Sequence, residues 1–228
     1  AKQYQFVNAS KIFAKTGGKL CAVPNFGNYV TAFQRASFGT FTFNSVFNSI
    51  ISLVLVLVIS FTLGYLLSRY RFRGRNLIYG VLMAAMMVPI YALIVPLFIQ
   101  EKKIGILNSR WSLIPVYVAM ELPMSVFLID SYMQGISIDM EEAAAIDGAG
   151  LLKTMFIIMM PLCKPILSTV VILTFMHVWN EFAFAQVLIS QESLKTIPIG
   201  LTYFTSQYMT SYTLLLAALA MATLPVLV

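Results

Sequence analysis

The sequence predicts an all-α, polytopic membrane protein, and two observations lead to this fold class. Of the 228 residues, 59% are hydrophobic and only 11% are charged, whereas soluble domains carry about 25% charged residues. Several long stretches contain little or no charge, and each approaches the roughly 20 apolar residues that a helix needs to cross a bilayer. The lipid bilayer is therefore the expected environment of the chain.

The apolar stretches predict about five membrane-spanning helices. They are residues 44–68, 76–100, 111–132, 165–189 and 212–228. The second stretch contains Pro89 and Pro96, which remove backbone donors and should bend the helix without ending it.

The two ends of the sequence suggest a longer membrane protein. The chain begins at Ala1 rather than Met, and residues 1–43 have neither the pattern of a signal peptide nor a span of their own. We expect this region to be an extracytoplasmic segment that follows a missing first helix. The last apolar stretch stops after about 17 residues, fewer than a full span needs. The prediction is about six helices, of which five are covered, with residues 44–228 forming the transmembrane domain.

The distribution of basic residues predicts the orientation. Four arginines fall between Arg69 and Arg75 with no acid among them, and such clusters beside a span favour the cytoplasm. Alternation then places residues 131–164 inside, and residues 101–110, 191–211 and 1–43 outside. The net charge of +6 is explained by these flanking residues, so no nucleic-acid partner is expected.

The two cysteines and the single histidine give no metal-binding pattern. Cys21 and Cys163 fall on opposite sides of the predicted membrane, so we expect no disulfide between them.

The inner loop 131–164 contains a predicted helix of about two turns. Asp139 precedes Glu142 by three residues, the spacing of a capping box at a helix start. Three alanines follow and favour helix. Gly148 and Gly150 offer an end at which a positive φ costs little.

The surface of this short helix suggests a docking element. Its alanines would present a small, flat face to a groove on another protein, while Glu141, Glu142 and Asp147 could meet basic groups at the rim. The alternative is a solvated surface helix without a partner, and periodicity alone leaves both open.

The same loop resembles the EAA loop of the permeases of ABC importers. Glu142-Ala-Ala is followed after three residues by Gly148, after nine more by Ile158, and then by Met160-Pro161. The family pattern ends Ile-x-Leu-Pro, so Met160 is the departure, and its volume and polarity are close to those of leucine.

Further motifs are similar to the carbohydrate-uptake branch of these permeases, of which the second permease of the maltose type is one. They lie at residues 71–75, 87–89, 141–149, 179–182 and 196–201. The resemblance implies the type I importer fold with six helices. It also implies a sugar or oligosaccharide as cargo and a multi-pass location in the bacterial cytoplasmic membrane.

The resemblance implies three kinds of protein partner. A second permease completes the pathway, two ATPase subunits dock on the inner loops, and an extracytoplasmic binding protein delivers the sugar. The residues that would couple this chain to an ATPase are Glu141, Glu142, Ala143, Ala144, Asp147 and Gly148.

Catalysis by this chain is not expected. The sequence has no phosphate-binding Gly-rich loop with Lys-Ser/Thr and no zinc-ligand spacing. ATP and Mg²⁺ would be bound by the partner subunits, and this chain would bind no cofactor.

Polar and aromatic residues within or beside the last spans are candidates for the substrate pathway, because polar groups in a membrane are costly. Glu121 and His177 are two of them, and each has a structural alternative. The candidates for contact with the cargo are Trp179, Asn180, Glu181 and Tyr203. Aromatic residues at this depth also serve as interface anchors, and Glu181 could simply be hydrated at the outer end of its span.

Three other functions compete with this interpretation. A secondary transporter driven by an ion gradient could use Glu121 or Glu181 as its ion site, although no inverted repeat is visible. An ABC permease could carry another solute, such as an oligopeptide or glycerol phosphate. A non-transporting scaffold could use the loop helix only to recruit partners.

Overall fold

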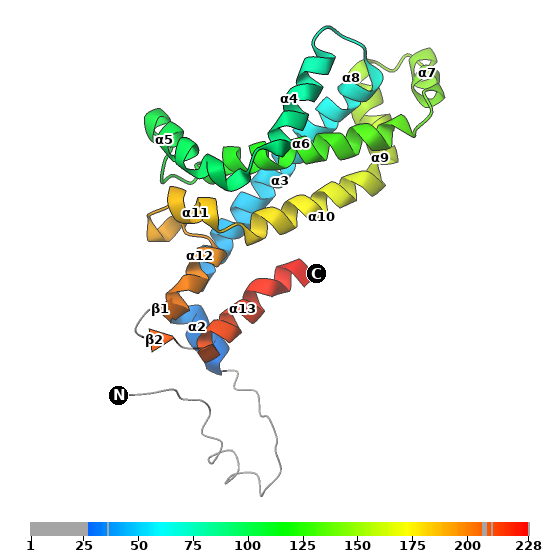
Figure 1. Cartoon of the computed structure of the whole chain (residues 1–228). Coiled ribbons are helices and arrows are strands. Elements are labelled where there is room, and N and C mark those ends of the chain that lie inside the picture. Colours follow the sequence, from blue (N-terminus) through cyan, green and yellow to red (C-terminus); the bar gives the residue numbers. More distant parts are fainter. Residues whose placement is uncertain (1–26, 36, 207–208, 211, 228) are drawn as a thin grey trace, which may run out of the picture.

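The computed structural model describes residues 27–35, 37–206, 209–210 and 212–227, and helices make up most of them (Figure 1). The all-α fold class is confirmed. The first helices are α2 (Gly27–Arg35), α3 (Phe38–Arg69), α4 (Arg75–Met87), η1 (Ile90–Leu93), α5 (Ile94–Ile104), α6 (Leu113–Gln134) and α7 (Asp139–Ile146). Then follow α8 (Leu151–Lys153), the π-helical turn η2 (Thr154–Met159), α9 (Met160–Leu162), α10 (Lys164–Asn180), α11 (Ala183–Leu188), η3 (Glu192–Leu194), α12 (Ile197–Leu201), η4 (Thr202–Phe204) and α13 (Tyr212–Leu227).

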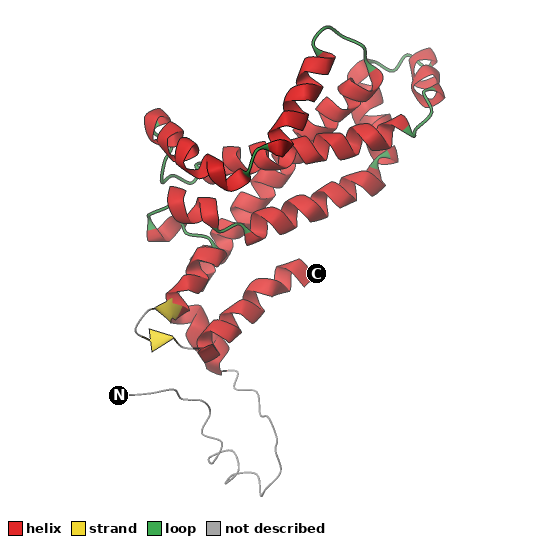
Figure 2. Ribbon diagram, viewed as in Figure 1, coloured by secondary structure: helices red, strands yellow, loops and turns green. Residues whose placement is uncertain are grey.

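A small β-ladder interrupts the helices. Strand β1 (Thr205–Ser206) pairs antiparallel with β2 (Met209–Thr210). Figure 2 shows both strands in yellow beside the start of α13, at the end of the molecule where α2 also lies.

Within the part of the chain that the structure describes, two helices are long and apolar enough to cross a membrane by themselves, namely α3 with 32 residues and α6 with 22. Two bent pairs would raise the number to four if each pair is one span: α4 with η1 and α5, bent by 99°, and α8–α9 with α10, bent by 79°. Helix α13 is shorter and also apolar. The described residues thus hold two to four candidate spans, whose bounds differ from those of the five predicted stretches.

The predicted continuous helix over residues 76–100 is wrong. Helix α4 ends at Met87, and Val88 is extended, with φ −76° and ψ 126°. The ring of Pro89 disfavours the helical region for the residue before it, so the chain breaks here. Pro96 lies in the first turn of α5, where the absence of its N–H costs little.

The predicted helix over residues 165–189 also divides. Helix α10 ends at Asn180, and Glu181 is extended, with φ −66° and ψ 128°. The carboxylate of Glu181 accepts the backbone N–H groups of Phe184 and Ala185 at 2.8 and 3.1 Å. A side chain that caps the next helix has therefore replaced the continuous backbone ladder.

The long helix α3 begins at Phe38, before the expected boundary at residue 44. Phe38 and Phe41 are buried in a cluster with Leu214 and Ala217 of α13. The start of α3 therefore lies in a buried cluster shared with α13, in a stretch that looked polar in the sequence.

Helix α3 is the axis of the fold, and α6 and α10 pack along it (Figure 1). At the crossing with α6, Gly64 allows a close approach: a Cβ at this position would lie 2.7 Å from Cγ2 of Ile129. Small residues at helix crossings let backbones pack tightly in membrane proteins.

The segments that we predicted to share a side of the membrane lie together. At one end, Arg69 of α3 contacts the loop and helix that begin the inner segment 131–164. At the other end, the Asn108 side chain accepts the N–H groups of Ser190 and Gln191 at 2.9 and 2.8 Å. Asn44 donates to the carbonyl of Ser193 at 2.8 Å.

Candidate coupling site

Helix α7 stands apart from the long helices, at the end of the molecule where α6 and α9 also end (Figure 1). It spans Asp139–Ile146, the predicted two turns. The predicted capping box between Asp139 and Glu142 is wrong, because Asp139 already lies inside the helix. Ser137 performs part of this role, since its Oγ accepts the N–H of Asp139 at 3.3 Å. The acidic residues of the first turn still complement the helix dipole.

The end of α7 is a Schellman motif built on Gly148. Its φ is +73°, its N–H donates to Ala145 O at 3.0 Å, and the N–H of Ala149 donates to Ala144 O at 2.9 Å. A glycine is favoured where φ is positive, so the predicted positive φ is confirmed at Gly148. Gly150 has φ −74° and does not share this need.

One face of α7 is fastened to α3. The Arg69 Nε donates to Glu141 Oε1 at 2.6 Å, and the Tyr65 hydroxyl donates to Glu141 Oε2 at 2.8 Å. The side chains of Arg69 and Glu141 are only 8% and 13% exposed. Charge-assisted hydrogen bonds in such a shielded place are stronger than those on an open surface. We call Tyr65, Arg69 and Glu141 the clamp.

The clamp also holds the segment that leads into α7. The Arg69 Nη2 donates to the carbonyl of Ile136 at 2.8 Å. On the same side of the helix, Ala144 is buried, and α7 packs against the π-helical turn η2. Sequence motifs did not indicate Tyr65 or Arg69 as part of this site, because they precede Glu141 by 76 and 72 residues in the chain.

The opposite face of α7 is open. Glu142, Ala143 and Asp147 are exposed there, and Ile146 is 87% exposed. The flat alanine face that we predicted is therefore wrong, because Ile146 projects from it. Ile146 follows Glu142 by four residues, so the two lie one above the other on the helix. This four-residue spacing is the signal in the sequence that could have identified Ile146 as part of the open face.

The six predicted coupling residues are thus divided between two faces. Glu142, Ala143 and Asp147 are free to meet a partner, and Gly148 shapes the turn beside them. Glu141 and Ala144 point toward the body of the protein.

The residues predicted for the substrate pathway do not gather at one site. Trp179 is 3% exposed, its Nε1 donates to the carbonyl of Ala222 at 3.0 Å, and its ring stacks on Phe175 with centroids 5.4 Å apart. This placement favours a packing role between α10 and α13 over stacking against a sugar.

Glu181 and Tyr203 are also engaged within the protein. Besides capping α11, Glu181 accepts the hydroxyl of Tyr117 at 2.9 Å. Tyr203 accepts a hydrogen bond from Lys195 Nζ at 2.9 Å and stacks on Phe41. Asn180 is exposed, and its amide donates to the carbonyl of Met176 at 2.8 Å.

The remaining polar candidates form a pair. His177 Nδ1 of α10 lies 3.1 and 3.2 Å from the two carboxylate oxygens of Glu121 on α6. Within the described residues, no group of three or more His, Cys, Asp or Glu side chains could hold a metal ion. Cys163 is a free, buried thiol, and Cys21 lies outside the described residues.

Comparison with known proteins places this architecture in a family. The sequence profile of the family described as "Binding-protein-dependent transport system inner membrane component" matches residues 57–228. The match covers α4 to α13 and the part of α3 from Leu57 onward, and it includes the clamp and α7.

Individual relatives agree with this match. The chain is 36% identical to the diacetylchitobiose uptake system permease protein NgcG of Streptomyces coelicolor, covering 89% of this chain and 68% of that one. It is 31% identical to the arabinooligosaccharides transport system permease protein AraQ of Bacillus subtilis, covering 90% and 73%.

A solved structure has the same fold. It is the crystal structure of a bacterial ABC transporter involved in the import of the acidic polysaccharide alginate, which superposes with a TM-score of 0.79 at 25% identity. The similarity covers 89% of this chain and 76% of that one. Together with the family match, these similarities identify the chain as a member of the inner membrane components of binding-protein-dependent transport systems, the permease subunits of ABC importers.

Proposed function

We propose that this chain is one of two permease subunits of a sugar importer in the bacterial cytoplasmic membrane, and that it crosses the membrane several times. The observation that carries the proposal is the two-sided helix α7. One face is held by Arg69 and Tyr65, and the other exposes Glu142 and Ile146. A short helix with one anchored and one open face is suited to pass a movement from a partner to the membrane helices.

The partner of the open face is an ATPase subunit, two of which would bind ATP and Mg²⁺ and perform the hydrolysis. Ile146 would fill an apolar pocket of that subunit, while Glu142 and Asp147 would meet basic side chains at its rim. Such a buried apolar anchor surrounded by polar contacts is typical of protein interfaces. This chain would contribute no catalytic group.

The cargo is a sugar or oligosaccharide that a binding protein delivers from outside. The names of the two relatives refer to diacetylchitobiose and arabinooligosaccharides, and the structural neighbour imports alginate. These substrates differ in size and charge but are all carbohydrates, which supports the class of cargo rather than a particular sugar.

Uptake by the reconstituted importer tests the proposal. The full chain would be co-expressed with the permease, ATPase and binding protein encoded beside it and placed in liposomes with ATP inside. Radiolabelled diacetylchitobiose, arabinotriose, raffinose and a tripeptide would be offered outside. We expect ATP-dependent uptake of at least one saccharide and none of the peptide.

Two controls separate the competing functions. Collapsing ion gradients with ionophores should leave the uptake unchanged. Uptake that follows an ion gradient without the ATPase would instead show a secondary transporter. ATP-dependent uptake of the peptide alone would show another cargo, and assembly without flux of any solute would show a scaffold.

A further inference from the structure

The pair formed by His177 and Glu121 is separate from the clamp and shares no residue with it. Its members come from two different long helices, α10 and α6, and the ring nitrogen Nδ1 faces both carboxylate oxygens at 3.1 and 3.2 Å. The pair is therefore fixed by the packing of two helices, and its arrangement does not depend on a loop.

The two side chains differ in exposure. The Glu121 side chain is 13% exposed, whereas that of His177 is 63% exposed. Among the described residues, Nε2 of the same imidazole has no hydrogen-bond partner. Glu121 thus orients the ring from behind, and the ring presents its second nitrogen outward.

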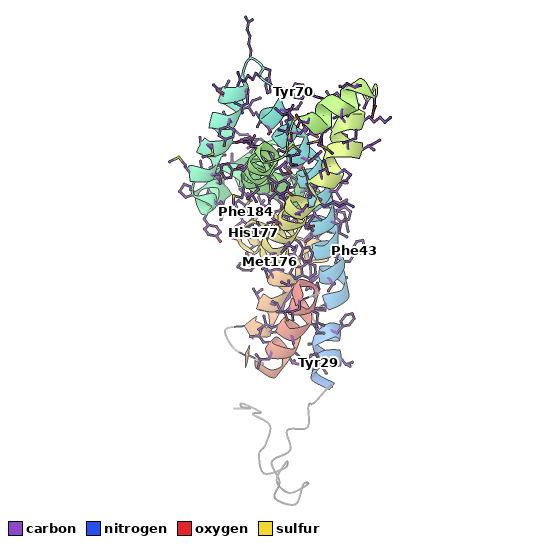
Figure 3. The ribbon with its side chains drawn as sticks, turned by 90° about the vertical axis from the view of Figure 1, so that its right-hand side faces the viewer. Tyr29, Phe43, Tyr70, Met176, His177 and Phe184 are labelled. Atoms are coloured by element: carbon purple, nitrogen blue, oxygen red, sulfur yellow. The ribbon has the colours of Figure 1, made fainter. Side chains whose placement is uncertain are left out.

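The polarity of the ring and its place midway along the fold argue against a lipid environment. Glu121 lies near the middle of the 22-residue helix α6. Figure 3 shows His177 and Met176 near the middle of the molecule, between Tyr70 at one end and Tyr29 at the other. Polar side chains at such depth face a helix bundle or water, because hydrocarbon cannot satisfy their hydrogen bonds.

The neighbouring surface of α10 has mixed chemistry. Asn180 is exposed one turn beyond Met176, and its donated bond to the Met176 carbonyl leaves its side-chain oxygen available as an acceptor. Met176 and Phe182 are 42% and 41% exposed. A ring nitrogen and an amide oxygen beside apolar surface suit a molecule with many hydroxyls and with apolar C–H faces.

We propose that His177, oriented by Glu121, and Asn180 form a contact site for sugar hydroxyls on the water-filled wall of the pathway. The inference rests on the proposed function, since it presumes a carbohydrate cargo. The site is separate from Trp179, which is buried against α13. In this site His177 and Asn180 touch the sugar, and Glu121 is a positioning residue.

Accessibility of a thiol at position 177 tests the water-filled wall. His177→Cys would be made in a chain whose own cysteines are replaced by serine, assembled into the importer, and treated with the water-soluble, membrane-impermeant reagent MTSES. Val54→Cys is the matched control, because Val54 is 51% exposed on the apolar surface of α3. We expect the thiol at position 177 to react at least about tenfold faster, since MTSES does not enter hydrocarbon. Equal, slow reaction at both positions would overturn the proposal.

Uptake kinetics test the contact with sugar. In the importer that transports one of the offered saccharides, His177→Gln should raise KM for that saccharide about fivefold to tenfold, as expected for the loss of one hydrogen bond. Glu121→Gln should raise KM less, because it disturbs only the orientation of the ring. The amount of assembled complex should stay the same.

The outcomes of this inference and of the proposed function can be told apart. If the unmodified importer takes up no saccharide, the proposed function fails. If it takes up a saccharide and His177→Gln leaves KM unchanged, the sugar contact alone is overturned. If His177→Gln lowers the yield of the complex and the complex that does assemble has an unchanged KM, the sugar contact is also overturned. The pair of His177 and Glu121 would then stabilise the assembled complex.

Discussion

Arg69 and Glu141 join the long helix α3 to the short helix α7: Nε of the arginine lies 2.6 Å from Oε1 of the glutamate. The adjacent Glu142 is exposed on the other side of the same helix. Two consecutive glutamates thus have different partners, one within the chain and one expected on the ATPase. This contact is one direct route by which a movement imposed on the open face can reach α3.

Removing the inner glutamate should loosen α7 without altering its docking face. Glu141→Gln replaces a charge-assisted contact by a neutral one, which should cost about 2 kcal/mol of local stability. We expect amide protons over residues 139–149 to exchange more than tenfold faster in the assembled importer. The matched variant Glu142→Gln should leave that exchange unchanged and weaken ATPase binding. Faster amide exchange in Glu142→Gln and weaker ATPase binding in Glu141→Gln would show that Glu142 anchors α7 and that Glu141 docks the ATPase.

The turn after α7 should depend on one of its two glycines. A Cβ would meet no atom within 4 Å at Gly148 or at Gly150, but only Gly148 has a positive φ. Gly148→Ala should cost about 1 kcal/mol of helix-end stability and reduce the sugar transported per ATP hydrolysed. Gly148→Asp should uncouple sugar transport from ATP hydrolysis more strongly, while the subunit stays in the membrane. Gly150→Ala is the control, and normal coupling in Gly148→Asp would refute the assignment.

Trp179 should prove to be a packing residue. Trp179→Ala removes a buried ring and should cost about 3 to 5 kcal/mol of stability, seen as a lower yield of intact complex. Trp179→Phe keeps most of the ring and loses the bond to Ala222, so its cost should be about 1 kcal/mol. In both variants the KM for sugar should remain that of the parent. A raised KM for sugar in Trp179→Phe would instead show that Trp179 contacts the sugar in the substrate pathway.

The crossing of α3 and α6 should not tolerate a larger residue at Gly64. Gly64→Ala would place its Cβ 2.7 Å from Cγ2 of Ile129, and overpacking of this kind costs about 1 to 3 kcal/mol. The thermal unfolding temperature of the complex should fall. Ile129→Ala alone leaves a cavity at a fully buried position and should cost about 2 to 5 kcal/mol, but it should cost less in the Gly64→Ala background, because the clashing methyl group is gone. Equal costs of Ile129→Ala in the two backgrounds would exclude this steric explanation.

The sequence was sufficient for the helical class and for helix α7, because charge-free length and local helix signals are local properties. It was less reliable for helix breaks. The break at Val88 has a visible cause in Pro89. At Glu181 the side chain caps α11 and also accepts the hydroxyl of Tyr117, a contact that no local pattern contains. The early start of α3 likewise lies in a cluster shared with the distant α13.

The candidate site shows the same division. Gly148 could be recognised because its turn is local. The roles of Glu141 and Glu142 could not be distinguished, since both are acidic residues of one helix turn and only the distant Arg69 separates them. Trp179 suggested sugar stacking by its residue type, whereas its contact with Ala222 lies 43 residues further along the chain.

Helix α4 has no buried residue, and Met87 at its end is 84% exposed. Within the chain this helix is held by contacts with α6 and by the bond from Arg75 to the carbonyl of Leu67, so we expect lipid or a second permease to cover its exposed surface. During biosynthesis, the exposed surface of α4 would distinguish an unassembled subunit from an assembled one. A newly made subunit without a second permease exposes the apolar side chains of α4. We expect membrane quality-control proteases to degrade such unassembled subunits faster than assembled ones.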